Sequence, residues 1–256
     1  MSIYVDLNSD MGEGFADYKM GLDSELLNFV TSANIACGWH AGDALIMSRT
    51  AKEAHTKGVG IGSHPGYPDM MAFGRRKMDV TAKEAAAYML YQTGALAAFA
   101  STHGTRLQHM KLHGAFYNTA SVKEEMAQAI VNALYDYDRR VIIMALSGSS
   151  FLQIAQDKGL KVAHEVFADR GYNEDGTLVD RKLPGAMITD PIKAIERVKR
   201  MVYDSKVEAI TGKWIDIKAD SICVHGDNPE AIAFVETIRN ELEKSGIKVR
   251  PLHTFL

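Results

Sequence analysis

The feature that most constrains the fold of this chain is the alternation of short apolar runs with longer segments of helical periodicity. Parallel strands need a crossover connection, usually a helix, so this alternation predicts βα units around a parallel sheet. The predicted strands span residues 3–7, 33–36, 60–63, 110–112, 141–145, 162–167 and 221–224, with a further short run at 247–249. A length of 256 residues suits one α/β barrel. We therefore expect a single (β/α)-barrel domain over residues 1–256.

Local signals mark where the helices between these strands begin. Two Ser/Thr–Glu pairs have the spacing of a capping box, and two dipeptides place a capping residue before a proline at the first helical position. These are Thr81–Glu84, Ser121–Glu124, Asp190-Pro191 and Asn228-Pro229. Apolar residues at helical spacing predict buried faces on the last two helices. They are Ile192, Ile195, Val198 and Val202 on one helix, and Ile232, Val235, Ile238 and Leu242 on the other.

The two kinds of loop differ sharply in composition. The joints from helix to strand are short and contain Gly58, Gly159 and Gly246, which suit the left-handed turn that ends a helix. The loops after the strands are rich in polar residues and span 8–15, 37–43, 64–69, 113–118, 169–172 and 225–228. Sites in parallel α/β folds form at the carboxyl ends of the strands, so we expect these loops to make one pocket. Residues 170–184 could be a lid, and 207–217 predicts a hairpin.

Composition excludes several classes of protein. The 29 basic and 32 acidic residues give a net charge of −3, which argues against a nucleic-acid partner. Cys37 and Cys223 are too few for a disulfide framework and are typical of reduced cytosolic thiols, with Cys37 expected to be an inert core residue more than a nucleophile. The N-terminus has no signal-peptide pattern, and no apolar stretch has the character of a membrane span. We expect a cytoplasmic protein without a membrane partner.

The end of the first strand carries three polar residues at alternating positions. Alternation turns Asp6, Asn8 and Asp10 toward the same side, which should be the barrel interior. Polar groups there are costly unless they meet a ligand, a metal ion or one another. The alternative is that these residues only fix the turn that follows the strand. We favour a functional role for them.

Histidines recur at the ends of the predicted strands. His64, His113 and His225 each follow a strand directly, and His40 lies in the loop after the second one. One such histidine is usually structural, but three in equivalent places, with His40 beside them, indicate a shared pocket in which a general base or a metal ligand could act. Asp227 follows His225 in its loop. We expect His55, His103 and His109 to be solvated, and Asp43 to act as a helix cap.

Two cations lie among these groups. Lys111 alternates with His113 and should point inward, where an ammonium could polarise a carbonyl or hold an anion. A structural role is the alternative, in which Lys111 pairs with Asp6 or Asp10. Arg170, after Glu165 and Asp169, is suited to grip a carboxylate. The sequence contains neither a phosphate loop nor a G-x-G-x-x-G turn, so no common nucleotide cradle is visible.

Six segments together resemble the LamB/YcsF family, the A subunits of 5-oxoprolinase. They are DLNSDMGEGF at 6–15, NIACGWHAGD at 34–43, GSHPGYPD at 62–69, KLHGAFYN at 111–118, EVFADRGY at 165–172 and CVHGDN at 223–228. The match extends over essentially the whole chain. It implies a distorted TIM-like (β/α) barrel of the glycoside hydrolase/deacetylase type. It also implies ATP-dependent hydrolysis of the lactam 5-oxo-L-proline (pyroglutamate) to L-glutamate with partner subunits B and C, which makes ATP a cosubstrate, with Mg²⁺ as its counterion.

The implied reaction gives the candidate residues their roles. Attack of water on the lactam carbonyl needs a general base, for which Asp10 and His40 are candidates, and stabilisation of an oxyanion, for which Lys111 and His113 are candidates. Arg170 is the candidate partner of the substrate carboxylate. The remaining predicted substrate-binding residues are Asp6, Asn8, His64, His225 and Asp227.

Two other functions fit the same residues. A metal-dependent amide hydrolase or deacetylase would hold a divalent ion with Asp10, His40 and His64. A non-catalytic regulatory subunit would use the inward-facing groups only to bind a small ligand. Dependence of turnover on ATP and on this chain separates the three.

Overall fold

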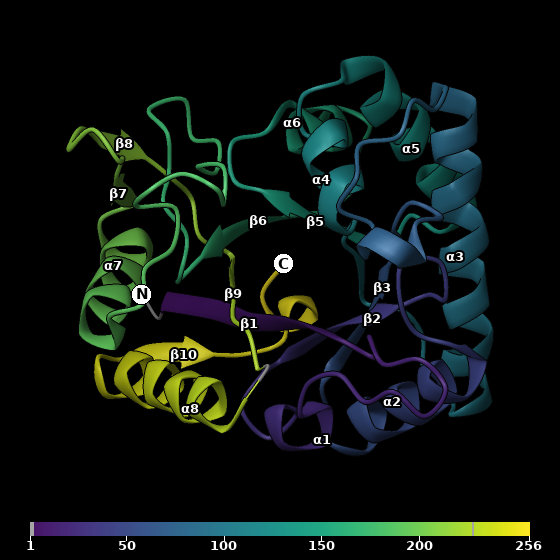
Figure 1. Ribbon diagram of the computed structural model, residues 1–256, viewed down its shortest axis with the longest axis horizontal. Helices are drawn as coiled ribbons and strands as arrows, with labels where there is room; N and C mark the ends of the chain where they lie inside the picture. Colours follow the sequence, from purple (N-terminus) through teal and green to yellow (C-terminus); the bar gives the residue numbers. More distant parts are fainter. Residues whose placement is uncertain (1–2, 227) are drawn as a thin grey trace.

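A computed structural model describes residues 3–226 and 228–256 of the chain. Among these residues, seven parallel strands close into a barrel in the order β1-β2-β3-β4-β5-β6-β9, and β9 returns to β1 (Figure 1). Their bounds are β1 Ile3–Met11, β2 Ser32–Ala36, β3 Gly60–His64, β4 His109–Met110, β5 Ile142–Leu146, β6 Val162–Phe167 and β9 Ser221–Cys223. This architecture confirms the expected (β/α) barrel with parallel strands.

Strand β1 pairs with three other strands because it is longer than its neighbours. Its first residues pair with β10 (Ile247–Val249), its middle with β9, and residues from Asn8 to Met11 with β2. The sequence predicted a strand that ends at residue 7, whereas extended backbone continues to Met11. This extension keeps the alternation of side chains through the polar segment. Asp6, Asn8 and Asp10 therefore share one side of the strand, and Leu7 and Met11 enter the hydrophobic core on the other.

Helices surround the strands and lie between consecutive ones in the chain (Figure 1). The helices are α1 Asp23–Leu26, α2 Ala44–Thr56, α3 Ala82–Thr102, α4 Gly114–Ala120, α5 Glu124–Tyr137, α6 Ser150–Asp157, α7 Pro191–Tyr203 and α8 Pro229–Lys244, with 3-10 turns at Met70–Ala72 and Leu252–Thr254. The Thr81–Glu84 capping box is present, and Asp43, Asp190 and Asn228 cap their helices as expected.

Two local expectations about helices are wrong. Ser121 does not cap α5, because its hydroxyl donates to the carbonyl of Tyr117 in the preceding helix, and the chain enters α5 through Lys123. Ile192 is 70% exposed, since the buried face of α7 is formed by Ala194, Val198 and Met201 instead. The face predicted for α8 is buried at all four positions. Periodicity thus located these helices but not every residue of their inner faces.

The segment between β6 and β9 interrupts the alternation of barrel strands and helices. The predicted hairpin is present as the antiparallel pair β7 (Lys206–Glu208) and β8 (Trp214–Asp216). Residues 168–190 fold back on themselves through single bridges between Arg170 and Met187 and between Tyr172 and Leu178. Among the described residues, the helices are all too short or too polar to cross a membrane.

Candidate active site

The polar side chains of β1 meet partners from two other strands inside the barrel. The Asn8 amide donates to the hydroxyl of Ser221 on β9 (2.7 Å), and its carbonyl oxygen accepts from Asn34 on β2 (2.8 Å). Asn34 also donates to Asp10 (2.8 Å), so the two residues of β1 are bridged by one amide. A hydrogen-bonded ladder therefore rises along the interior toward the carboxyl ends of the strands.

Asp6 lies below this ladder and is fully buried. Its carboxylate accepts hydrogen bonds from the hydroxyls of Thr31, Ser32 and Ser221. Burial raises the pKa of Asp6 from 3.8 to about 6, against the effect of these three donors. All partners of this carboxylate belong to the barrel itself, so the geometry favours a structural role over the predicted contact with substrate.

Asp6 should make the stability of the protein depend on pH. Its carboxyl binds a proton more tightly in the folded chain than in the unfolded one, so its contribution to stability is full below about pH 4 and is lost as the pH rises through about 6. We expect Asp6→Asn to remove about 3 kcal/mol of the loss in unfolding free energy between pH 4 and pH 7, measured by urea denaturation. Asp204→Asn, at an exposed helix end, is the control and should keep the wild-type slope.

Lys111 is the buried cation of the site, with a side chain only 3% exposed. Its ammonium lies 3.0 Å from Asp10 and 2.6 Å from Glu165 of β6. Glu165 also accepts a hydrogen bond from the hydroxyl of Tyr117 (2.8 Å), and the Lys111 ammonium lies 3.5 Å from the thiol of Cys223. Burial lowers the pKa of Lys111, but the two carboxylates outweigh it and hold this pKa well above its ordinary value. The lysine is therefore charged at neutral pH.

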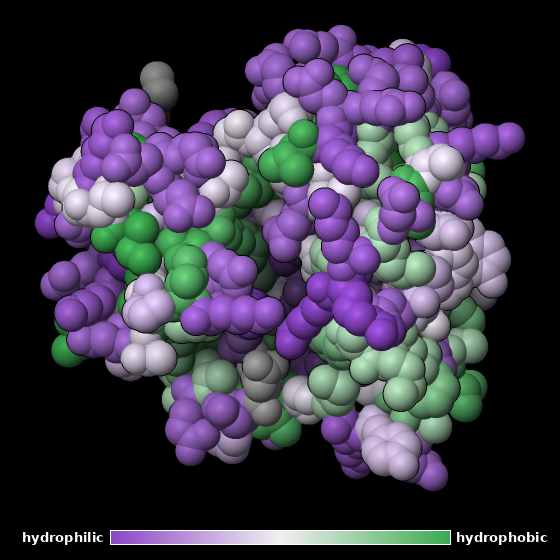
Figure 2. Space-filling model, turned by 45° about the horizontal axis from the view of Figure 1, so that its top comes forward, coloured by the Kyte–Doolittle hydropathy of each residue, from purple (hydrophilic) through white to green (hydrophobic). Residues whose placement is uncertain are grey.

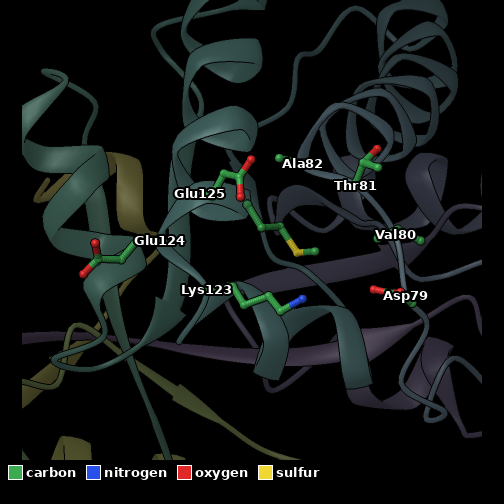
Figure 3. A pocket seen from close by; sticks show the side chains of 8 residues that line it. Asp79, Val80, Thr81, Ala82, Lys123, Glu124 and Glu125 are labelled. Carbon is green, nitrogen blue, oxygen red and sulfur yellow. The ribbon is translucent and has the colours of Figure 1, made fainter.

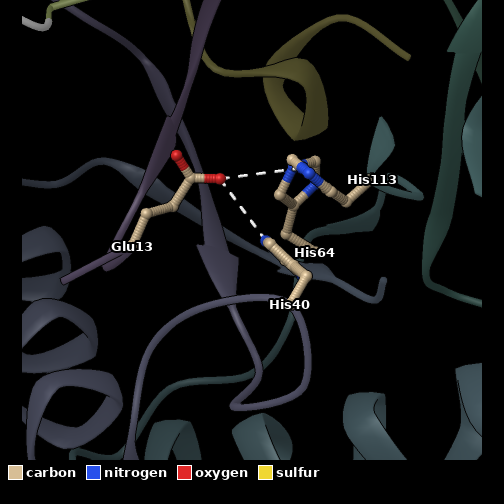
Figure 4. A group of neighbouring side chains, drawn as sticks. All are labelled: Glu13, His40, His64 and His113. Carbon is tan, nitrogen blue, oxygen red and sulfur yellow. Dashed lines mark hydrogen bonds and ion pairs between the residues drawn. The ribbon is translucent and has the colours of Figure 1, made fainter. Parts of the chain in front are cut away.

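Three histidines and a glutamate gather beside this ion pair (Figure 4). The rings of His40 and His113 are stacked with centroids 3.8 Å apart, and His64 meets both edge-on. Glu13 points at the group, with its Oε1 3.4 Å from His40 Nε2 and 3.6 Å from His113 Nδ1. His64 Nε2 lies 3.3 Å from Asp10. The structure thus brings Asp10, His40, His64 and His113 together at the carboxyl ends of the strands, as the sequence predicted.

Burial and neighbouring charges set the protonation of this cluster. Burial, helped by the other histidines, holds the pKa of His40 well below 6.5 and lowers that of His113 to about 3, so both rings are neutral at pH 7. Burial raises the pKa of Asp10, but the nearby His64 and Lys111 outweigh it and hold this pKa well below 3.8. The pKa of Glu13 is raised well above 4.5 by burial and by the charge of Asp10. Asp10 is accordingly ionised at neutral pH, and its side chain is 19% exposed.

Two glycines let the histidine rings pack so closely. A Cβ added at Gly66 would lie 2.4 Å from Nδ1 of His40, and one added at Gly74 would lie 2.8 Å from Cβ of His40 and 2.9 Å from Cδ2 of His113. The backbone at both glycines therefore forms a wall of the cluster.

Cys37, three residues before His40, is buried. Burial raises the pKa of its thiol to about 12, as expected for an inert core residue.

The structure places Arg170 and His225 outside this cluster. The Arg170 guanidinium donates to the carbonyl of Val179 in its own loop, and within residues 3–226 and 228–256 no hydrogen bond or ion pair joins it to the cluster. His225 lies 3.6 Å from Asp169, at the end of β9. Asp227 lies outside the described residues. The predicted substrate contacts of Arg170, His225 and Asp227 remain predictions.

Several residues of the site were missed from the sequence. His109 was expected to be solvated, and this is wrong. It is fully buried on β4 and bonds to Asn34 (2.7 Å). Its position two residues before Lys111 gave the signal, because alternation turns both inward. Glu13, Tyr117 and Cys223 had no such signal.

The face drawn in Figure 2 is hollowed near its centre, where hydrophilic side chains border the depression. A separate pocket lies between the start of α3 and the start of α5 (Figure 3). It is lined by Asp79, Val80, Thr81, Ala82, Lys123, Glu124, Glu125 and Met126. None of the candidate site residues lines this separate pocket, so we place the chemistry in the barrel.

The fold and the site together define a class of protein, a parallel α/β barrel with a buried His–carboxylate–Lys constellation at the ends of its strands. The LamB/YcsF family model matches residues 5–256, and this chain belongs to that family. A relative from Fusobacterium nucleatum, named as the A subunit of 5-oxoprolinase, is 57% identical over 256 residues, which cover all of both chains.

Solved structures agree with this assignment. A lactam utilization protein from Thermus thermophilus is 40% identical, with a TM-score of 0.91 over 97% of this chain and 99% of that one. A family 4 carbohydrate esterase from Streptomyces lividans, 10% identical, has a TM-score of 0.51 over 96% of this chain and 91% of its own. The latter shows the fold alone, and it confirms the expected TIM-like barrel of the deacetylase type.

Proposed function

We propose that this chain is the A subunit of a 5-oxoprolinase, and that with subunits B and C it opens the lactam 5-oxo-L-proline to L-glutamate at the expense of ATP. The observation that carries the proposal is the 57% identity, over the full length of both chains, to a relative that bears this name. The similarity to a lactam utilization protein supports a cyclic amide as the substrate. The absence of a phosphate loop in the sequence supports a location of the ATP site on one of the partners.

The site supplies the groups that lactam hydrolysis requires. Water must attack the ring carbonyl carbon while a base takes its proton, and the C–N bond then breaks with protonation of the nitrogen. Asp10 is the best candidate for the base, because it is ionised and partly exposed, whereas His40 is fully buried. Lys111 suits the developing oxyanion better than His113, since the lysine is charged and the histidine is neutral.

The poor reactivity of an amide carbonyl explains why ATP would be needed. A carboxylate held well below 3.8 is a weak base, and an amide carbonyl is a poor electrophile. Transfer of the γ-phosphoryl group from ATP to the lactam oxygen, with release of ADP, would make the carbon more electrophilic. Attack of water and cleavage of the C–N bond, with protonation of the nitrogen, would then leave an acyl phosphate, which a second water would hydrolyse to glutamate and phosphate. A weak base then suffices for the attack of water.

Reconstitution tests this proposal. We expect glutamate release from 5-oxoproline by the chain mixed with subunits B and C and ATP, and none when this chain, a partner or ATP is omitted. Turnover by B and C without this chain would give it a purely regulatory role. The histidine cluster favours a second candidate, metal-dependent amide hydrolysis, for which ATP-independent cleavage by this chain alone would be the signature.

A further inference from the structure

We propose that Glu13, His40, His64 and His113 bind one divalent transition-metal ion at the barrel mouth. Each of the four side chains offers one ligand atom, and these atoms all lie within 4.8 Å of one another (Figure 4). The sequence suggested Asp10, His40 and His64 for such a site. The structure keeps the two histidines, adds His113 and replaces Asp10 by Glu13. This proposal stands on side-chain geometry and does not depend on the proposed lactam hydrolysis.

The hydrogen bonds of two histidines point their lone pairs at each other. His64 Nδ1 lies 2.8 Å from the backbone carbonyl of Lys111, and His113 Nε2 lies 2.8 Å from that of Phe73. A carbonyl oxygen only accepts, so both of these ring nitrogens must carry the proton. In neutral rings the opposite nitrogens, His64 Nε2 and His113 Nδ1, are then unprotonated. In that state they face each other at 2.9 Å with no hydrogen between them.

Carboxyl oxygens surround this pair. Asp10 Oδ2 lies 3.3 Å from His64 Nε2, and Glu13 Oε1 lies 3.6 Å from His113 Nδ1. Such a convergence of lone pairs is unfavourable without a positive charge among them. Two nitrogens that share an ion at about 2.1 Å lie about 3.0–3.4 Å apart, so a small adjustment of the rings would admit one. A ring nitrogen that donates to a backbone carbonyl is also the usual support of a histidine ligand.

The donor set selects the kind of ion. Imidazole nitrogens suit Zn²⁺, Fe²⁺, Ni²⁺ and Cu²⁺, whereas Mg²⁺ and Ca²⁺ prefer oxygen ligands. Three histidines and one carboxylate therefore favour Zn²⁺ or a similar transition metal over Mg²⁺. When bound, such an ion would supply a Lewis acid beside Asp10. The ligand side chains of His40, His64 and His113 are held in place before an ion binds, because they are buried. The Glu13 side chain is 17% exposed, so an ion would enter the cluster from its side.

A shared proton is the rival explanation. If His64 were an imidazolium, its Nε2–H could donate to His113 Nδ1, and the charge of Asp10 would stabilise it. The same distances would then need no metal. Direct titration with metal ions separates the two explanations without any measurement of turnover, so its outcome is independent of the proposed reaction.

The test uses the full chain after removal of metals with a chelator. We expect Zn²⁺ to bind with a stoichiometry of one per chain by calorimetry, and Co²⁺ to give visible absorption bands, while Mg²⁺ competes weakly. His64→Gln and His113→Gln should each weaken Zn²⁺ binding at least about 10-fold. Glu13→Gln, at the more exposed position, should weaken it as well and serves if a histidine variant does not fold. His55→Gln is the control, because His55 is exposed on α2.

Two results would overturn the proposal. One is a folded wild-type chain that binds neither Zn²⁺ nor Co²⁺ at one per chain, which would leave the shared proton as the explanation. The other is Zn²⁺ binding that Glu13→Gln and the histidine variants leave unchanged, which would place the ion elsewhere.

Discussion

Replacement of Lys111 by Met should lower the free energy of unfolding by about 3–5 kcal/mol. The ammonium lies 2.6 Å from Glu165, whose side chain is fully buried, and 3.0 Å from Asp10. Methionine preserves much of the volume of the stem but leaves the Glu165 carboxylate without its cation. A buried charge that loses its partner keeps its whole desolvation cost. Urea denaturation of the two proteins at pH 7 measures the difference.

Two further variants make this measurement specific. Lys199→Met breaks a half-buried pair with Glu241 near the surface and should cost only about 0–1 kcal/mol. The double change Lys111→Met with Glu165→Gln removes both charges and should recover most of the stability. A loss below about 1 kcal/mol in the single variant would show that Glu165 does not rely on Lys111.

The double variant also separates the two roles that the sequence left open for Lys111. The structure shows the carboxylate pairing that a structural role requires, with Glu165 as well as Asp10. Pairing does not exclude an action on substrate. If the stable double variant has no turnover in the reconstituted complex, the ammonium is needed for the reaction. If it is active, Lys111 only balances Glu165.

Alternation along strands allowed much of the site to be predicted. Asp6, Asn8 and Asp10 occupy alternate positions of one strand, which predicted that all three face the interior, and they do. The same rule would have turned His109 inward with Lys111, but the predicted fourth strand began one residue too late to include it. Residues on strands are thus predictable because the backbone fixes their direction.

Residues on loops escaped prediction for the opposite reason. Glu13 lies beyond the end of β1, where alternation no longer applies, and its approach to His40 depends on how two loops fold back over the barrel. Glu165 pairs with Lys111 because the closed sheet turns residues of β6 and the residue after β4 toward the same interior. Arg170 has the chemistry of a carboxylate grip, but its loop turns the guanidinium to Val179. The sequence identified the candidate residues, but which of them contact one another depends on the fold.

The largest effect on activity is expected from Asp10→Asn, which should lower glutamate release by the reconstituted complex about 10²–10⁴-fold. Asparagine cannot take a proton from water, but its oxygen can still accept from Asn34 and Lys111, and its amide can donate to His64 Nε2. Glu165 remains as the counterion of Lys111, so the unfolding free energy should change by less than about 1 kcal/mol.

The matched control is Asp190→Asn, because Asp190 caps α7 at the surface and asparagine caps a helix equally well. Both turnover and stability should stay at the wild-type level in this control. A split between kcat and KM adds a further criterion, since loss of the base should appear in kcat with KM little changed. An Asp10→Asn protein that turns over 5-oxoproline at the wild-type rate would remove Asp10 from the reaction. If the Asp10→Asn protein loses activity only in proportion to the fraction of chains that are unfolded, Asp10 acts only as an ion-pair partner of Lys111.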